Sequence, residues 1–242
     1  MNKLDKKSEV YVVQYNEEVL VIHYDCNRRK YWDRKNVCVI GDEDLHNILV
    51  DKVHSNSIYI ANIETIIIDP LLVNYKFKYC SSLFSGFVKL KRIIGLEYLN
   101  TSEVVSMRCM FRACKSLVSL NLKGFDTSKV RDMSKMFADC FNLAELDLSN
   151  FNTSNVTEMQ YMFNECRSLT SLDLRNFNTS SVEYMDNMFS CCKGLTEVNI
   201  SSFNTSDETR MRWMFAECKN LKTIHTGDGW NISRKFSEGI FC

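Results

Sequence analysis

A segment of about 26 residues recurs five times between Leu99 and Gly227, and this repeat constrains the fold more than any other feature. Each unit contains an Asn/Asp-Thr-Ser triplet, a methionine, a Met-Phe pair, a cysteine and a phrase of the L-x-x-L-x-L type, at constant spacing. A unit of this length cannot bury its apolar side chains alone, so successive units must stack on one another. The sequence therefore predicts a solenoid over more than half of the 242 residues.

Within one unit the apolar spacing changes from helical to strand-like. Four apolar residues stand at i, i+3, i+6 and i+7: Val156, Met159, Met162 and Phe163. This spacing predicts a short helix. Further along, Leu172 and Leu174 alternate with Asp173, which predicts a strand with the leucines inward and the aspartate outward. The predicted fold class is an α/β repeat solenoid, a leucine-rich-repeat array of parallel strands and short helices.

The parts outside the five repeats are expected to close the array. Two β-rich runs, Val10 to Gln14 and Val19 to Tyr24, flank the turn residues Asn16-Glu17-Glu18 and predict a β-hairpin. The predicted organisation is an N-terminal cap region with this hairpin (1–70), a degenerate capping repeat (71–98), five leucine-rich repeats (99–227) and a truncated C-terminal repeat (228–242).

Composition and motifs argue against several functional classes. The formal net charge is zero, so a basic nucleic-acid-binding surface is not expected. No run of about 18 apolar residues predicts a membrane span. Catalytic and phosphate-binding motifs are missing from the sequence, and the spacing of cysteines and histidines does not suggest a zinc site. We therefore expect a protein that is not an enzyme and has no catalytic residues, no cofactor and no metal.

The cysteines bear on localisation. Five of the eleven form one column of the repeat and are expected to be buried free thiols. Two others, Cys109 and Cys191, lie off this column and are expected to face solvent, which suits a reducing compartment such as the cytoplasm. The charged N-terminal stretch, with its short interrupted apolar run, is not typical of a secretory signal.

The repeat phrases FDTSKVRDMSKMFADCFNLAELDLSN and FNTSNVTEMQYMFNECRSLTSLDLRN resemble those of the BspA-like leucine-rich-repeat surface proteins. The resemblance covers residues 75 to 230, and the hairpin region before the array also resembles family members. It implies a surface-exposed or secreted, adhesin-like interaction protein that is not an enzyme. Two localisations thus stay open, the cell surface implied by the resemblance and the cytoplasm suggested by the thiols.

The outward positions of the strands provide the predicted binding surface. Six polar residues of these columns are the candidate binding residues: Asn121, Glu145, Asp147, Asp173, Glu197 and Asn199. A polar surface of this kind suits a protein or a glycan partner. The predicted helix side is a second possible surface and offers five large side chains: Tyr161, Tyr184, Arg210, Arg212 and Trp213.

Four functional classes remain open from the sequence. The leading hypothesis is an interaction protein that binds through its solenoid surface. The alternatives are a structural or antigenic repeat protein without a specific ligand, an intracellular leucine-rich-repeat effector or scaffold, and an enzyme or sensor whose active part lies in residues 1–62. The sequence does not indicate an oligomeric state.

Overall fold

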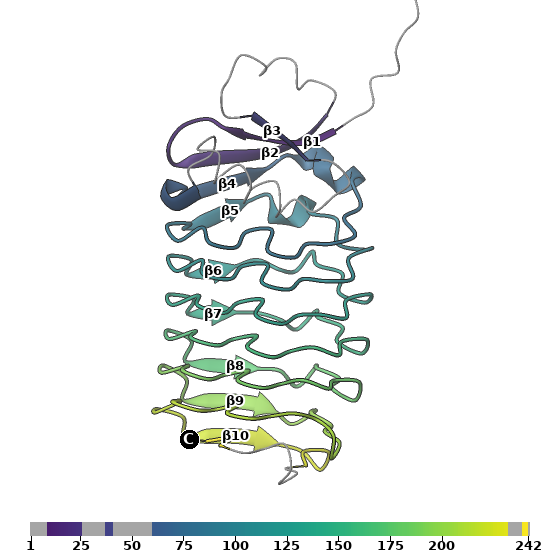
Figure 1. The fold of residues 1–242 in the computed structure, drawn as a ribbon, viewed down its shortest axis with the longest axis vertical. Helices are drawn as coiled ribbons and strands as arrows, with labels where there is room; N and C mark the ends of the chain where they lie inside the picture. Colours follow the sequence, from purple (N-terminus) through teal and green to yellow (C-terminus); the bar gives the residue numbers. More distant parts are fainter. Residues whose placement is uncertain (1–8, 26–36, 41–59, 232–238, 242) are drawn as a thin grey trace, which may run out of the picture.

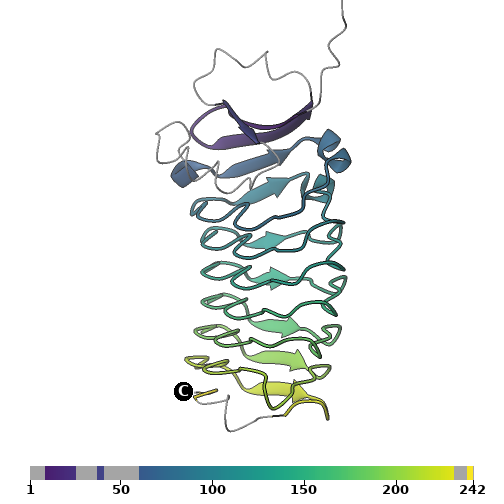
Figure 2. The same cartoon turned by 45° about the vertical axis from the view of Figure 1, so that its right-hand side comes forward.

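The computed structural model describes residues 9–25, 37–40, 60–231 and 239–241. In Figure 1 the chain winds into stacked coils along the long axis, from the N-terminal strands in purple to the last coil in yellow. The turned view of Figure 2 shows the same single stack. The predicted leucine-rich-repeat solenoid is confirmed, with one coil for each repeat.

Each repeat contributes one short strand to the solenoid. These strands are β6 (Ser119–Leu120), β7 (Glu145–Leu146), β8 (Ser171–Asp173), β9 (Glu197–Ile200) and β10 (Thr223–Thr226). Pairing is parallel between β6 and β7 and along β8, β9 and β10. Leu172 pairs with Val198 and both are buried, whereas Asp173 is exposed. The predicted inward and outward positions of the strands are therefore correct.

The N-terminal strands join the array through one mixed sheet. β1 (Glu9–Gln14) and β2 (Val19–Asp25) form the predicted antiparallel hairpin. β3 (Val37–Ile40) pairs with β1, while β4 (Thr65–Ile68) lies parallel between β2 and β5 (Arg92–Ile94). The sheet order is thus β3-β1-β2-β4-β5. The sheet continues directly into the first coils, whereas the division of the chain into cap and repeats stays a prediction.

Short 3₁₀ turns flank the strands β4 and β5 along the chain. They are η2 (Ile60–Asn62), η3 (Pro70–Asn74) and η4 (Leu96–Tyr98). Pro70 begins η3, where its missing N–H is not needed, and the Asp69 side chain accepts a hydrogen bond from the Leu71 amide at 2.9 Å. β4 therefore ends just before the turn that Pro70 begins.

The predicted helix of each repeat is wrong. In its place the described chain forms successive tight turns, and Lys135 and Asp139 adopt left-handed backbone conformations with φ of 58° and 62°. Alternate amides donate to the next coil, as from Met133 to the Glu158 carbonyl at 2.9 Å. The intervening amides bond three residues back, as from Met136 to Met133 at 3.2 Å. An α-helix would need bonds four residues back, so hydrogen bonding between coils replaces it.

A phenylalanine column forms the centre of the core. Seven rings stack along the solenoid axis: Phe84, Phe111, Phe137, Phe163, Phe189, Phe215 and Phe241. Their neighbouring centroids lie 5.1 to 5.7 Å apart. Because Phe84 belongs to residues 71–98, this segment continues the array as a further coil.

The cysteine column has a specific hydrogen-bonding role. Each column thiol donates to a phenylalanine carbonyl of the preceding coil, as from Cys140 Sγ to the Phe111 oxygen at 3.1 Å. The equivalent donors are Cys114, Cys166, Cys192 and Cys218, at 3.0 to 3.2 Å. The column thus satisfies buried carbonyls as well as filling space, which explains a cysteine where an aliphatic residue would pack equally well.

The two cysteines off the column differ from one another. Cys191 is partly exposed, as expected, but Cys109 is buried at 9% exposure, so its predicted solvent-facing position is wrong. Of the two thiols that suggested a reducing compartment, only Cys191 is therefore partly exposed to solvent.

We expect the column thiols to resist alkylation in the folded protein. Burial raises the pKa of Cys140 to about 12 and that of Cys218 to about 11, so the thiolate that reacts is scarce at neutral pH. Alkylation at pH 8, followed by peptide mass spectrometry, should modify Cys191 at least about a hundredfold faster than Cys140. In denaturant both should react alike. Equal rates in the folded protein would contradict the buried hydrogen-bonded column.

A one-residue adjustment preserves the core of the fifth repeat. Glu208 stands where the other repeats have valine, and the sequence predicts poorer packing there. In the structure Glu208 is exposed and the neighbouring Thr209 is buried in its place, with its amide bonded to the Ser206 carbonyl at 3.1 Å. The carboxylate therefore avoids burial without interrupting the stack.

Candidate functional site

The six candidate residues of the strand face lie where the sequence places them. Asn121, Glu145, Asp147, Asp173 and Glu197 are exposed, and Asn199 is partly buried. Parallel pairing places Asp173 beside Asn199, and Glu145 and Glu197 beside the serines of the preceding strands. The structure thus brings these residues onto one polar face of the solenoid.

Several of these side chains also hold the turn that follows their strand. Asp147 Oδ1 accepts from the Ser149 amide at 3.0 Å, and Asn199 Oδ1 accepts from the Ser201 amide at 3.1 Å. Hydrogen bonds from Ser149 lower the pKa of Asp147, and those from Arg175 lower the pKa of Asp173. The recurrence of Asn and Asp in this column therefore has a structural cause in each coil.

Glu145 and Glu197 belong to the neighbouring column of this face. Glu197 Oε1 lies 2.7 Å from His225 Nε2 of the next strand. None of the six candidate residues is aromatic, and the four acidic side chains among them are exposed to solvent. These six residues line neither of the two hollows described below.

A hollow lies on another face of the solenoid, beside a second ladder of parallel bridges between coils. The bridges run through Ser106, Asp132, Glu158, Tyr184 and Arg210. The hollow, which we name the bridge groove, has a volume of about 440 Å³. Three consecutive coils line it, with the residues Glu158, Gln160, Tyr161, Tyr184, Asp186, Asn187, Arg210, Arg212 and Trp213.

One column of the repeat explains why a hollow forms there. Tyr161, Asn187 and Trp213 occupy equivalent positions in successive coils, all in left-handed backbone conformations with φ between 54° and 60°. The short Asn187 stands between two large rings and leaves space above it. Trp213 is 46% exposed, and the equivalent position of the next turn is Gly239, which has no side chain to cover the ring.

The charges of the bridge groove balance in number, with two carboxylates (Glu158 and Asp186) and two guanidinium groups (Arg210 and Arg212). Asp186 is only 8% exposed, and its carboxylate accepts from the Arg212 amide at 2.9 Å and lies 3.2 Å from Arg210 Nε. The Arg210 guanidinium also lies over the Tyr184 ring at 5.3 Å. At the edge, Lys135 Nζ lies 5.1 Å from the centroid of Tyr161. The groove therefore presents aromatic faces and hydrogen-bonding groups, and the formal charges of its lining residues sum to zero.

Sequence reasoning identified only part of this groove. It placed Tyr161, Tyr184, Arg210, Arg212 and Trp213 together on one side, although as part of a helix that does not form. It missed the four polar residues between them: Glu158, Gln160, Asp186 and Asn187. The available signal was the change of residue type from coil to coil at these columns, which contrasts with the constant core columns.

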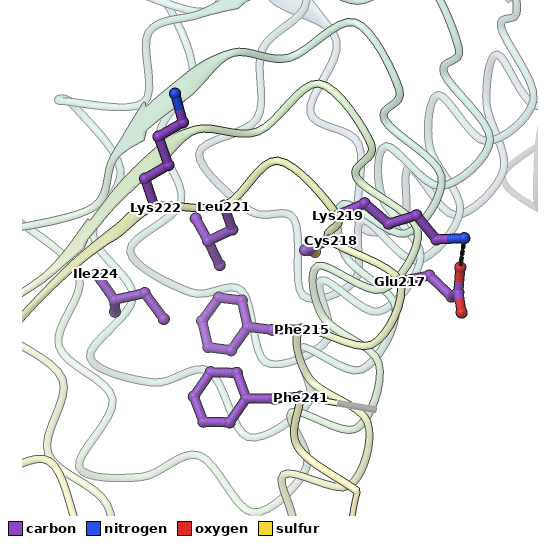
Figure 3. A pocket seen from close by; sticks show the side chains of 8 residues that line it. All are labelled: Phe215, Glu217, Cys218, Lys219, Leu221, Lys222, Ile224 and Phe241. Carbon is purple, nitrogen blue, oxygen red and sulfur yellow. Dashed lines mark ion pairs between the residues drawn. The ribbon is translucent and has the colours of Figure 1, made fainter.

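A second hollow lies at the C-terminal end of the stack and is mainly apolar. Figure 3 shows Phe215, Phe241, Leu221 and Ile224 pointing into it, with the Lys219–Glu217 ion pair at the rim. Its volume is about 370 Å³. These side chains correspond to core positions that the following coil covers in earlier repeats, so the hollow is an exposed part of the core column.

Within the described part of the chain, the helical turns are all far too short to cross a membrane.

Comparison with known proteins gives a family and one similar structure. A family described as "Mycoplasma protein of unknown function, DUF285" matches residues 78–193 and, in an overlapping match, residues 141–238. No curated protein matches the chain. The crystal structure of the T. pallidum leucine-rich-repeat protein (TpLRR) is similar, with 18% identity and a TM-score of 0.48 over 93% of this chain and 82% of that chain. Because the family matches span residues 78–238, well over half of the sequence, the chain belongs to the DUF285 family of Mycoplasma proteins of unknown function.

Proposed function

We propose that this chain is a non-enzymatic interaction protein that binds another protein or a glycan through its solenoid surface. The bridge groove is the main contact surface in this proposal. The observation that carries it is the gathering of Trp213, Tyr161, Tyr184 and two arginines from three coils around one hollow. Tryptophan, tyrosine and arginine are the residues that most often dominate binding energy at protein surfaces.

The other positions of the repeat already have structural roles. The phenylalanine stack fills the core, the cysteines satisfy carbonyls, and threonines such as Thr127 bond the backbone of the next coil at 2.8 and 2.9 Å. The groove residues differ from coil to coil, so the repeat itself does not require them. A surface that the fold does not explain is the best candidate for a function.

The strand face is the second candidate surface. Its exposed carboxylates, Asp147, Asp173, Glu145 and Glu197, could contact a polar or basic partner, with a strength that falls as salt rises. The resemblance to BspA-like surface proteins supports an adhesin-like role for either surface. A role inside the cell as a scaffold would use the same surfaces on a different partner.

Two matched variants separate the surfaces. One carries Tyr161→Ala and Trp213→Ala in the groove, and the other carries Glu145→Ala, Asp147→Ala, Asp173→Ala and Glu197→Ala on the strand face. We expect the groove variant to bind an immobilised extracellular-matrix and cell-surface extract at least about tenfold more weakly than the unchanged chain, because hot-spot aromatics are lost. The strand-face variant should bind within about twofold of the unchanged chain. Surface plasmon resonance gives the affinities.

Thermal unfolding followed by circular dichroism must first establish that both variants are folded. Loss of binding in the strand-face variant alone would move the site to that surface. Equal binding by all three proteins, without saturation, would instead favour a structural or antigenic repeat protein without a specific ligand.

A further inference from the structure

We propose that the bridge groove binds a neutral, hydroxyl-rich glycan, with Trp213 as the surface on which a sugar ring packs. This inference rests on the proposed function and names the class of ligand for the same groove. Three features of the groove support it: an exposed aromatic face, a lining whose charges balance, and buried polar atoms without hydrogen bonds.

Trp213 offers the exposed aromatic face. A Cβ atom at Gly239 would stand 2.6 Å from the Cδ1 and Nε1 atoms of this ring, so only glycine lets the chain pass this closely. The backbone thereby fixes one edge of the indole, while 46% of the side chain stays exposed. The C–H face of a sugar ring is apolar and packs on such a ring without any change of charge.

The balance of charges favours a neutral ligand. Asp186 is already bonded to the Arg212 amide and lies beside the Arg210 side chain, and Glu158 accepts from Gln160 Nε2 at 2.9 Å. The two carboxylates of the groove are matched in number by the guanidinium groups of Arg210 and Arg212, so its lining has no net charge that would attract an ion. A neutral ligand leaves the contacts of Asp186 in place and adds its own hydrogen bonds.

Two buried polar atoms of the groove residues supply unused hydrogen-bonding capacity. Gln160 Oε1, an acceptor, and Arg212 Nε, a donor, have no hydrogen-bond partner among the described residues. A hydroxyl group both donates and accepts, so one sugar hydroxyl can serve either atom or both. The two atoms are covered in the ligand-free protein, so binding requires rotation of the Arg212 side chain, which is long and only partly buried. Satisfying such atoms removes the free-energy cost of leaving them buried without a hydrogen bond.

A peptide bound as an added strand fits this groove less well. The backbone groups of the bridge ladder are already used between coils, as in the bonds from Met159 to the Tyr184 carbonyl at 2.8 Å and from Met185 to the Arg210 carbonyl at 2.7 Å. The peptide backbone would therefore find few free main-chain partners there. A protein partner that contacts only side chains is kept as an outcome of the test.

The test titrates the full chain with a panel of neutral oligosaccharides built from glucose, galactose, mannose and N-acetylglucosamine. Isothermal titration calorimetry measures binding, and tryptophan fluorescence reports contact with Trp213. We expect saturable binding of at least one neutral oligosaccharide, unchanged within about twofold when salt rises from about 50 to 500 mM, because no charged contact is screened. Trp213→Ala should weaken this binding at least about tenfold, whereas Trp213→Phe should restore much of it.

Two further variants keep the test specific. Gln160→Met keeps the size of the side chain but removes both the unpartnered oxygen and the Nε2 hydrogen bond to Glu158, so it should weaken binding several-fold while the protein stays folded. Trp230→Phe changes a tryptophan that packs on Phe203 outside the groove, and it should leave both the affinity and the ligand-dependent fluorescence change intact.

The outcomes distinguish this inference from the proposed function. If none of the neutral oligosaccharides binds, or if Trp213→Ala binds them as well as the unchanged chain, the glycan inference is wrong. If, in addition, the groove variant loses a protein ligand, the proposed function stands and its ligand is a protein. If neither sugars nor proteins depend on the groove, both proposals fail.

Discussion

Replacing Leu172 with aspartate should unfold much of the array. Leu172 lies in β8 with 4% of its surface exposed, and its strand pairs with β9. The new carboxylate would be buried among apolar side chains without a cationic partner. We expect the free energy of unfolding to fall by about 4 to 5 kcal/mol or more, which is at the upper end for single substitutions. Urea unfolding followed by circular dichroism measures this change.

The matched control is the next residue along the same strand. Asp173 is exposed and bonds to the Arg175 amide at 3.2 Å and to the Arg175 side chain. Because an exposed ion pair contributes little, Asp173→Ala should cost less than about 1 kcal/mol. If the two substitutions destabilise the protein equally, the inward and outward positions assigned to the strand are wrong.

Replacing Phe163 with alanine should have the second largest effect. Its ring is fully buried between Phe137 and Phe189, with centroid distances of 5.7 and 5.5 Å and nearly parallel planes. Truncation of a buried phenylalanine typically costs about 3 to 5 kcal/mol, from lost burial and from the cavity that remains. Each coil contacts mainly its neighbours, so a defect in the middle of the stack should also separate the unfolding of the two halves.

Phe241 provides the control because it occupies the same column at the end of the stack. It is 58% exposed, and among the described residues its ring stacks on Phe215 alone, at 5.7 Å. Phe241→Ala should therefore cost less than about 1 kcal/mol and leave one cooperative transition. If Phe163→Ala lowered the free energy of unfolding by as little as Phe241→Ala, the phenylalanine column would not be what holds the coils together. Differential scanning calorimetry resolves one transition from two.

The strand residues of the repeat show what residue spacing within one repeat can predict. The alternation of Leu172 with Asp173 placed one residue inside and one outside, and the structure agrees. Such alternation has only one common explanation, a strand with one buried face, so it predicts orientation reliably. The same reasoning did not reveal that Asp147 and Asn199 hold the next turn, because that role depends on the backbone conformation after the strand.

The Met-Phe segment shows where local spacing is ambiguous. Residues at i, i+3, i+6 and i+7 indicate one face of a short helix, but a series of three-residue turns also brings i, i+3 and i+6 to equivalent positions. The choice depends on where the amides bond, and the Met133 amide bonds to the Glu158 carbonyl of the next coil. A partner 25 residues away is invisible within one repeat, so the helix prediction failed although the buried residues were correctly named.

The sequence by itself determined the period, the number of coils, the core columns and the hairpin of β1 and β2, because each of these follows from spacing within or between repeats. Only the tertiary structure decided the turns, the thiol bonds of the cysteine column and the bridge groove. The groove depends on side chains from three coils that meet only after stacking, with Asn187 short between Tyr161 and Trp213. Stacking of the coils makes neighbours of residues that lie about 26 positions apart in the sequence. The groove forms between such residues, so the spacing within one repeat does not reveal it.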